Sequence, residues 1–111
     1  MRGLPPSLRS RKRYIAFKVI CEVEVDGKMI EKALEAKMAE LFGDIALAES
    51  KISLEYFNDN KGILGCERKS FDKVLIALTF LTEINGFKVL PITVGASGNV
   101  RKCKKKYLEV L

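Results

Sequence analysis

The feature that most constrains the fold of this chain is an alternating stretch that runs from Tyr14 to Val25. Every second residue in it is apolar: Ile15, Phe17, Val19, Cys21, Val23 and Val25. Because successive side chains of a strand point to opposite faces of a sheet, this pattern predicts a long strand with one buried face. Four cations lead directly into the strand: Arg9, Arg11, Lys12 and Arg13. A rigid strand holds such charges close to a folded surface, which favours an anionic partner.

The length of 111 residues and the apolar share of 48% suit one domain with a single hydrophobic core. No apolar run approaches the roughly 20 residues that span a bilayer, and the first residues lack the apolar segment of a secretory signal. We therefore expect a cytoplasmic protein that has no membrane partner.

Histidine and cysteine, which commonly carry catalysis or bind metal ions, are scarce in this chain. It has three cysteines, which stand singly, and no histidine. A structural zinc site or a Cys–His nucleophile cannot be assembled from them, and the commonest general base near neutral pH is missing. We expect buried, reduced thiols, no cofactor or metal bound by the protein, and no catalytic residue.

Positive charge is concentrated at the two ends of the chain. Residues 1–13 and 101–106 each carry five cations and no anion, whereas the remainder has ten cations and fourteen anions. A mildly acidic body with two cationic ends suits binding to phosphates, although two merely solvated ends would have the same composition. The candidate RNA-binding residues are Arg9, Arg11, Lys12, Arg13, Arg101, Lys102, Lys104, Lys105 and Lys106.

The remaining patterns predict helices and strands in the order β-α-β-β-α-β. After a break at Asp26-Gly27, helical spacing of apolar residues extends over residues 28–42, and Gly43 suits a left-handed C-terminal cap. Alternation over residues 51–58 and 63–68, on either side of a turn-rich segment, predicts an antiparallel hairpin. The first of these two strands should present three apolar residues on one face: Ile52, Leu54 and Tyr56.

A second helix should begin at Ser70, a good N-cap residue, and end near Ile84, before Asn85-Gly86. A strand over residues 87–94 follows, in which Pro91 favours an edge position. This order of elements is that of the ferredoxin-like α+β fold, which RNA-recognition motifs share, and we expect that fold with an added basic helix. The expected regions are a basic arm over residues 1–13, a ferredoxin-like domain over 14–98 and a basic helix over 99–111 that packs on the same domain.

The second helix is apolar over most of its circumference, although packing on one sheet requires only a single apolar stripe. The chain is too small to bury all of this surface, so we expect part of it to dock on a partner protein or on a second copy of the chain. The candidate interface residues are Phe71, Leu75, Ile76 and Phe80.

A glycine-containing segment near the C-terminus leaves another function open. Gly95-Ala96-Ser97-Gly98 should form a loop before the third helix and could bind a phosphate, although it lacks the lysine and serine of a Walker motif. With Asn99 and Arg101 nearby, it allows a small phosphate-binding enzyme of the acylphosphatase type. A protein-interaction module whose basic ends only confer solubility is the other alternative. The apolar stripe of the third helix should consist of Val100, Cys103, Tyr107 and Leu111.

Three parts of the chain carry a resemblance to a known family. They are Leu4-Pro5-Pro6-Ser7-Leu8-Arg9 leading into Lys12-Arg13-Tyr14-Ile15-Ala16-Phe17, then Tyr56-Phe57-Asn58 with Gly62-Ile63, and finally Gly95-Ala96-Ser97-Gly98 before a basic helix. Together they resemble the archaeal and eukaryotic ribonuclease P protein component 2 family, the Pop5/Rpp14 type. Lys61 and Asn99 depart from the family pattern, which usually has threonine at both positions.

The resemblance implies an RNA-binding, non-catalytic subunit of the ribonucleoprotein that removes the 5′ leader from precursor tRNA. It also implies that the RNA subunit is the catalyst and uses Mg²⁺. The implied partners are ribonuclease P RNA, precursor tRNA and a TIM-barrel-like protein subunit. Self-association within the complex is the alternative that the apolar helix leaves open. The reasoning from residues agrees, since it finds cations at both ends, no catalytic constellation and a helix with surplus apolar surface.

Overall fold

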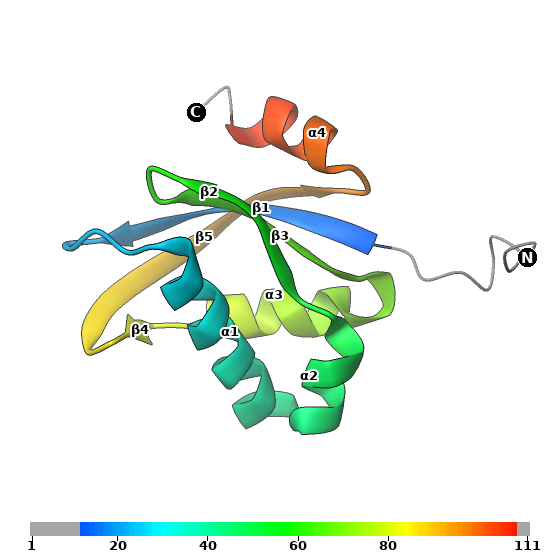
Figure 1. Ribbon diagram of the computed structural model, residues 1–111, viewed down its shortest axis with the longest axis horizontal. Helices are drawn as coiled ribbons and strands as arrows, with labels where there is room; N and C mark the ends of the chain where they lie inside the picture. The colour runs from blue at the N-terminus through cyan, green and yellow to red at the C-terminus, as the bar shows by residue number, and fades with distance from the viewer. Residues whose placement is uncertain (1–11, 109–111) are drawn as a thin grey trace, which may run out of the picture.

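Strand β1 (Lys12–Cys21) lies in the middle of a five-stranded antiparallel sheet in the computed structural model, which describes residues 12–108 (Figure 1). The other strands, in the order β2-β3-β1-β5-β4 across the sheet, are β2 (Ser53–Asn58), β3 (Lys61–Glu67), β4 (Glu83–Ile84) and β5 (Phe87–Ser97). The alternating stretch therefore predicted the central strand correctly. The candidates Arg9 and Arg11 lie outside the described residues.

β1 is shorter than the alternating pattern predicted. Its pairing with β5 ends at Cys21 and its pairing with β3 ends at Lys18, so neither strand continues beside residues 22–25. The chain bends there, and the Sγ of Cys21 donates a hydrogen bond to the carbonyl oxygen of Val23 at 2.7 Å. Val25 is still buried, although it lies in no strand. The predicted end was wrong because alternation records burial and not the point at which partner strands stop.

Three helices cover one face of the sheet: α1 (Gly27–Phe42), α2 (Asp44–Ser50) and α3 (Phe71–Thr79) (Figure 1). The side chain of Asp26 caps α1, because it accepts a hydrogen bond from the N–H of Met29 at 2.9 Å. Gly43 follows α1 with a φ of 92° and a ψ of 165°, so it lies outside the left-handed helical region that the predicted cap requires. Full burial of a large apolar side chain contributes roughly 1.5–3 kcal/mol, so the core between helices and sheet is a major source of stability. Its largest members include Ile15, Phe17, Ile30, Leu34, Met38, Leu64 and Leu78.

Two short C-terminal elements cover part of the opposite face: α4 (Val100–Cys103) and the π-helical turn η3 (Lys104–Leu108) (Figure 1). Cys103 and Leu108 are buried against Ala16 and Ile63, which form a second, smaller core. The π-helical turn is wider than an α-helical one, so the next buried residue after Cys103 comes five positions later. The predicted stripe therefore missed Leu108, and Leu111, which it included, lies outside the described residues.

A β-bulge in β2 overturns the predicted face of that strand. Its register with β3 shifts between Leu54 and Tyr56. Because a bulge inserts one extra residue, Leu54 packs with Ile52 on the main core, whereas Tyr56 packs on the second core beneath α4 and η3. The spacing of these three residues gives no sign of the bulge.

α3 is shorter than predicted and begins differently. A 3₁₀ turn, η2 (Arg68–Ser70), precedes it. Ser70 occupies the predicted N-cap position, but its side chain makes no capping hydrogen bond to the helix. The helix ends at Thr79, and Ile84 belongs to β4 instead. Asn85-Gly86, expected to stop the helix, forms the turn of the β4–β5 hairpin with φ values of 50° and 84°. Both φ values are positive, as tight hairpin turns require.

β5 extends to Ser97, so three residues of the predicted loop over 95–98 belong to a strand. β4 pairs only with the first two residues of β5. Beyond them β5 forms an edge of the described sheet, and Pro91 lies in this part, as predicted.

These elements follow the ferredoxin-like plan. The order β2-β3-β1-β5, with α1 and α3 on one face, is that of the β-α-β-β-α-β fold, so the predicted fold class is confirmed. β4 is an addition at the edge. Among the described helices, none is long and apolar enough to cross a membrane.

Candidate nucleic-acid interface

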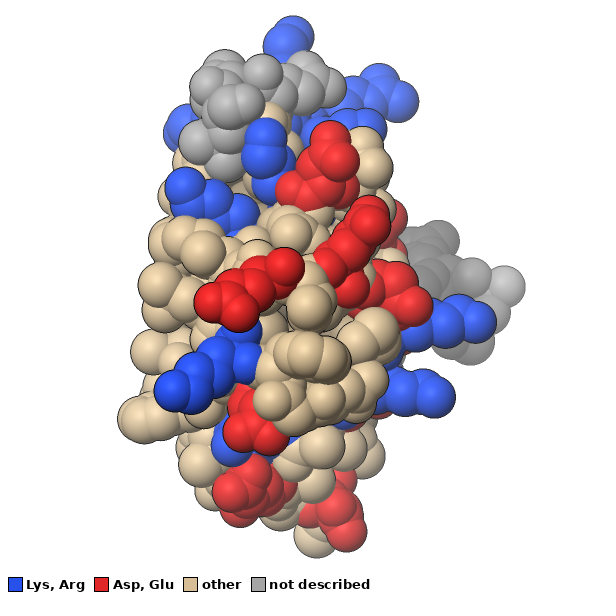
Figure 2. Space-filling model, turned by 90° about the vertical axis from the view of Figure 1, so that its left-hand side faces the viewer, with Lys and Arg blue, Asp and Glu red and all other residues tan. Residues whose placement is uncertain are grey.

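α4 and η3 display the C-terminal candidate cations. The side chain of Asn99 accepts a hydrogen bond from the N–H of Lys102 at 3.0 Å, so this departure from the family pattern still provides an N-cap. Residues 100–108 contain five cations and no acid. Four of these cations are exposed, and Lys104 is half-buried. Figure 2 shows cations gathered at the top of the molecule, where α4 lies in Figure 1. We call these five the C-terminal basic cluster: Arg101, Lys102, Lys104, Lys105 and Lys106.

Two tyrosines anchor the C-terminal basic cluster on the sheet. The Nζ of Lys104 lies 4.2 Å from the centre of the Tyr56 ring. This cation–π contact holds the ammonium group against the ring, so Lys104 is less available to a ligand than its neighbours. The ring of Tyr107 packs directly on Gly95, where any Cβ would overlap it, and its hydroxyl donates a hydrogen bond to the carbonyl oxygen of Ala96 at 3.4 Å. Contacts with β2 and β5 therefore orient the cluster.

The fold places the N-terminal candidates next to this cluster. The Sγ of Cys103 donates a weak hydrogen bond to the carbonyl oxygen of Tyr14 at 3.7 Å, so α4 lies beside the start of β1. The two residues in this contact are 89 positions apart in the sequence. Lys12 and Arg13, the described members of the N-terminal candidates, directly precede Tyr14.

Lys12 and Arg13 differ in their surroundings. Lys12 is exposed, and its Nζ donates a hydrogen bond to the carbonyl oxygen of Lys51 at 3.4 Å. Arg13 is half-buried, and its guanidinium carbon lies 5.2 Å from the centre of the Phe71 ring. Arg13 therefore helps to hold α3 on the sheet, whereas Lys12 presents its charge at the surface.

Four further cations, which the charge pattern of the sequence did not indicate, lie on the segments that surround the start of β1 or follow from them. Lys51 follows α2, Arg68 and Lys69 belong to η2, and Lys73 lies in the first turn of α3. They stand singly or in a pair along the chain, with acids close by in sequence, so no run of charge indicates them.

The apolar surface predicted on α3 is smaller than expected. Ile76 is 43% exposed and Phe80 is 57% exposed. Phe71 and Leu75, the other two candidate interface residues, are half-buried and pack against the main core. Exposed apolar surface from this set therefore comes chiefly from Ile76 and Phe80.

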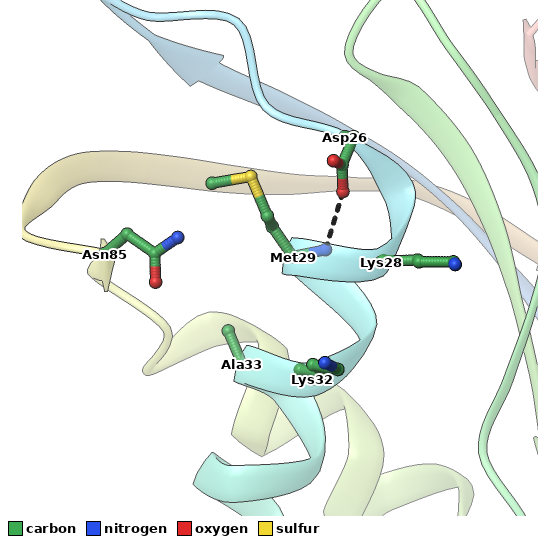
Figure 3. Close-up of a pocket in the computed structure, with 6 residues that line it drawn as sticks. All are labelled: Asp26, Lys28, Met29, Lys32, Ala33 and Asn85. Carbon is green, nitrogen blue, oxygen red and sulfur yellow. Dashed lines mark hydrogen bonds between the residues drawn. The ribbon is translucent and has the colours of Figure 1, made fainter.

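The hollow between the start of α1 and the β4–β5 turn is lined by one carboxylate and two lysines (Figure 3). Its only carboxylate among the lining residues belongs to Asp26, which is already bound to the N–H of Met29 as the cap of α1. The hollow measures about 450 Å³ and is lined by Asp26, Lys28, Met29, Lys32, Ala33 and Asn85.

Metal binding, thiol chemistry and phosphate binding by a loop also have little support in the described residues. Within residues 12–108, no three His, Cys, Asp or Glu side chains are placed to hold a metal ion. Burial raises the pKa of Cys66 to about 11 and also raises the pKa of Cys103, so both thiols stay protonated near neutral pH. The predicted phosphate loop of an acylphosphatase-type enzyme is largely strand, which removes the feature that supported that alternative.

Comparisons with known proteins agree on one family. The model of the Rpp14/Pop5 family matches residues 13–108. Ribonuclease P protein component 2 of Archaeoglobus fulgidus is 51% identical over 110 residues, which cover 99% of this chain and 100% of that protein. The protein of the same name from Pyrococcus furiosus is 36% identical over 107 residues, which cover 95% of this chain and 89% of that one.

One solved structure has a similar fold. A chain in the cryo-EM structure of yeast ribonuclease MRP superposes with a TM-score of 0.67 at 10% sequence identity. The match covers 80% of this chain and 75% of the yeast chain. At this identity the likeness establishes the fold.

Proposed function

Because this chain belongs to the Rpp14/Pop5 family, we propose that it is a protein subunit of ribonuclease P that binds the RNA of that enzyme and supports removal of the 5′ leader from precursor tRNA. The observation that carries the RNA-binding role is the contact between Cys103 and Tyr14. It joins the C-terminal basic cluster to the basic start of β1, so cations from both ends of the chain share one rigid scaffold.

Charge fixed on such a scaffold suits the phosphate backbone of RNA. Each phosphate contact releases bound counterions, so affinity falls with salt by a slope of ~0.9 per contact for duplex DNA and ~0.7 for single strands. The C-terminal basic cluster has four exposed cations and no acid between them. No carboxylate within this run therefore offsets the attraction of these cations for phosphate.

We place catalysis in the RNA, with Mg²⁺ as an ion that the RNA uses. Phosphodiester hydrolysis needs an activated water and stabilisation of negative charge, commonly by bound metal ions. The cations of this chain suit a supporting task, since fixed positive charge offsets repulsion between phosphates of a folded RNA. That contribution reduces the amount of Mg²⁺ that the RNA requires.

The partners we propose are ribonuclease P RNA, precursor tRNA and a TIM-barrel-like protein subunit, with self-association within the complex. Ile76 of α3 and Phe80, which directly follows the helix, are the exposed apolar side chains that a protein partner or a second copy would cover. Full burial of such a side chain contributes roughly 1.5–3 kcal/mol. The cytoplasmic location stays a prediction.

Binding of the full chain to ribonuclease P RNA over a range of salt concentrations tests the RNA-binding role. We expect the logarithm of the affinity to fall linearly and steeply with the logarithm of the salt concentration. In cleavage assays with the RNA and the partner subunit, addition of this chain should raise the rate most at low Mg²⁺. Robust cleavage of precursor tRNA by the protein without RNA would overturn the proposal.

A further inference from the structure

We propose that cations of the α2–β2 junction, η2 and α3 extend the basic start of β1 into a further contact surface for RNA phosphates, beyond the C-terminal basic cluster. The proposal rests on the proposed function, because it takes the ligand to be the backbone of the same RNA. We call this surface the N-terminal basic patch, and its described members are Lys12, Arg13, Lys51, Arg68, Lys69 and Lys73.

The start of β1 lies between two of the contributing segments. On one side, the Nζ of Lys12 donates its hydrogen bond to the carbonyl oxygen of Lys51, which ties β1 to the α2–β2 junction. On the other side, Lys12 is the antiparallel partner of Glu67, the residue that precedes Arg68. Strand pairing and one side-chain hydrogen bond therefore bring cations from three segments to one place.

Lys69 and Lys73 extend the patch from η2 onto the start of α3. The Nζ of Lys73 also lies 5.8 Å from the centre of the Phe42 ring, so this lysine packs on the end of α1 as well. Lys69 pairs with Glu49 of α2 at 3.8 Å, and both side chains are more than half exposed. Both lysines line a hollow of about 170 Å³ with Ala46, Glu49 and Ser70. This volume is below the roughly 300 Å³ at which small-molecule pockets begin, and Glu49 lines the hollow together with the two lysines. The lysines therefore offer a surface contact and not an enclosed site.

The net charge of the patch is positive although acids are present. Three acids accompany the six cations: Glu49, Glu67 and Asp72. Glu67 is only 5% exposed, and its Oε2 makes no hydrogen bond with the described residues, so this carboxylate does not face a ligand at the surface. Arg68, by contrast, is exposed, as are Lys69 and Lys73. A phosphate backbone at this surface would therefore meet more cations than anions.

The gathering of cations here contrasts with another side of the molecule. Figure 2 shows that acidic and basic side chains interleave over its middle and lower parts. The body of the chain as a whole has more acids than cations. A patch with twice as many cations as acids therefore departs from the surface around it and favours an anionic ligand.

A triple variant tests the inference: Arg68→Gln, Lys69→Gln and Lys73→Gln in the full chain. The matched control carries Lys28→Gln, Lys32→Gln and Lys88→Gln, which remove the same charge from exposed cations outside the patch. We expect the triple variant to lower the salt slope of binding to ribonuclease P RNA by up to ~0.9 per lost contact, and the control to change it little. Thermal unfolding of both variants shows whether the fold is retained.

A variant with the opposite effect is Glu49→Gln. It removes the acid that competes for Lys69, at little cost in stability because an exposed pair contributes about 0–1 kcal/mol. We expect it to strengthen RNA binding, and most at low salt.

The outcomes separate this inference from the proposed function. If the wild-type chain shows no salt-dependent binding to the RNA, the proposed function fails. If the wild type binds but the folded triple variant keeps the slope of the control, the N-terminal basic patch is not an RNA contact. Loss of binding to the partner subunit with an unchanged RNA slope would also overturn the inference and assign the patch to an acidic protein segment.

Discussion

The two basic regions of the molecule are built in different ways. The C-terminal basic cluster comes from one run of six residues without an acid, and two buried residues, Cys103 and Leu108, hold it on the sheet. The N-terminal basic patch comes from β1, the α2–β2 junction, η2 and α3, and it includes three acids. One region therefore depends on a single docked segment, whereas the other depends on strand pairing and helix packing together.

This difference indicates how each region can be altered. Charge in the cluster can be removed without touching the main core, because its exposed members project from a surface element. Members of the patch are divided between exposed side chains, such as Arg68, and Arg13, which packs on Phe71. Substitution in the patch therefore changes charge and packing together unless only exposed residues are chosen.

The largest expected effect comes from neutralising the exposed members of the cluster: Arg101→Gln, Lys102→Gln, Lys105→Gln and Lys106→Gln. Lys104 stays unchanged because it packs on Tyr56. The salt slope of RNA binding should fall by up to ~0.9 per lost contact, and the Mg²⁺ requirement of the reconstituted enzyme should rise.

The control for this variant replaces four cations outside both basic regions: Lys28, Lys32, Lys37 and Lys88. It changes the net charge equally and should leave the slope close to that of the wild type. Equal losses in the two variants would mean that net charge, and not the cluster, governs binding.

The apolar surface of α3 should separate protein contacts from RNA contacts. Ile76→Asp and Phe80→Asp place a charge where we expect a partner, so each should abolish assembly while RNA binding by the isolated chain stays intact. Sedimentation of the chain with its partner subunit measures the effect, and Thr82→Asp, at another exposed position, is the control. A strictly monomeric protein whose complex tolerates both changes would contradict the assignment of this surface.

Gly95→Ala should loosen the C-terminal basic cluster without removing any charge. A Cβ at this position overlaps the ring of Tyr107, so η3 has to move, and overpacking of this kind costs roughly 1–3 kcal/mol. We expect a melting temperature lower by several degrees and weaker RNA binding. Gly98→Ala is the matched control, because a Cβ there meets no atom within 4 Å. Equal behaviour of the two variants would mean that the Tyr107 contact does not hold the cluster in place.

The smallest effect concerns the two thiols that lie beneath the basic regions, Cys66 by the patch and Cys103 within α4. Burial raises the pKa of Cys66 from 9.0 to about 11. The folded state therefore keeps the thiol protonated where the unfolded chain ionises, so this stability is fully present below pH 9 and is lost as the pH rises through 11. Urea unfolding at pH 8 and pH 10.5 should show this loss in the wild type and a smaller loss in Cys66→Ala.

Alkylation gives a direct check on the same thiols. At pH 8 the half-buried Cys21 should react first, while Cys66 and Cys103 stay protected. Rapid labelling of Cys103 alone would show that α4 leaves the sheet. Rapid labelling of Cys66 would show instead that the start of β1 opens.

Much of the fold follows from patterns within single segments. The alternation through Phe17 and Val19 predicts the central strand, and the helical spacing that follows the break at Asp26-Gly27 predicts α1. The turn-rich segment after Asn58 predicts the β2–β3 hairpin. Each of these features depends on side-chain periodicity or on hydrogen bonds between residues close in sequence, so a local pattern is sufficient.

Other features depend on contacts that no local pattern records. The bulge after Leu54 turns Tyr56 towards the second core, and the π-helical turn buries Leu108 five positions after Cys103. In both cases packing against a distant segment outweighs the local periodicity. β4 differs, because its pairing partner Phe87 lies only three residues after Ile84. Asn85-Gly86 is a local signal for a tight hairpin turn and was interpreted as the end of a helix.

The same division applies to the candidate site. The C-terminal basic cluster can be predicted from the residue order, since a run of like charges is a property of the covalent chain, and Lys12 and Arg13 are indicated in the same way. Folding is needed to bring Lys51 and Arg68 beside Lys12, and α4 beside Tyr14. These neighbours are far apart along the chain, and strand pairing and helix packing alone bring their charges together.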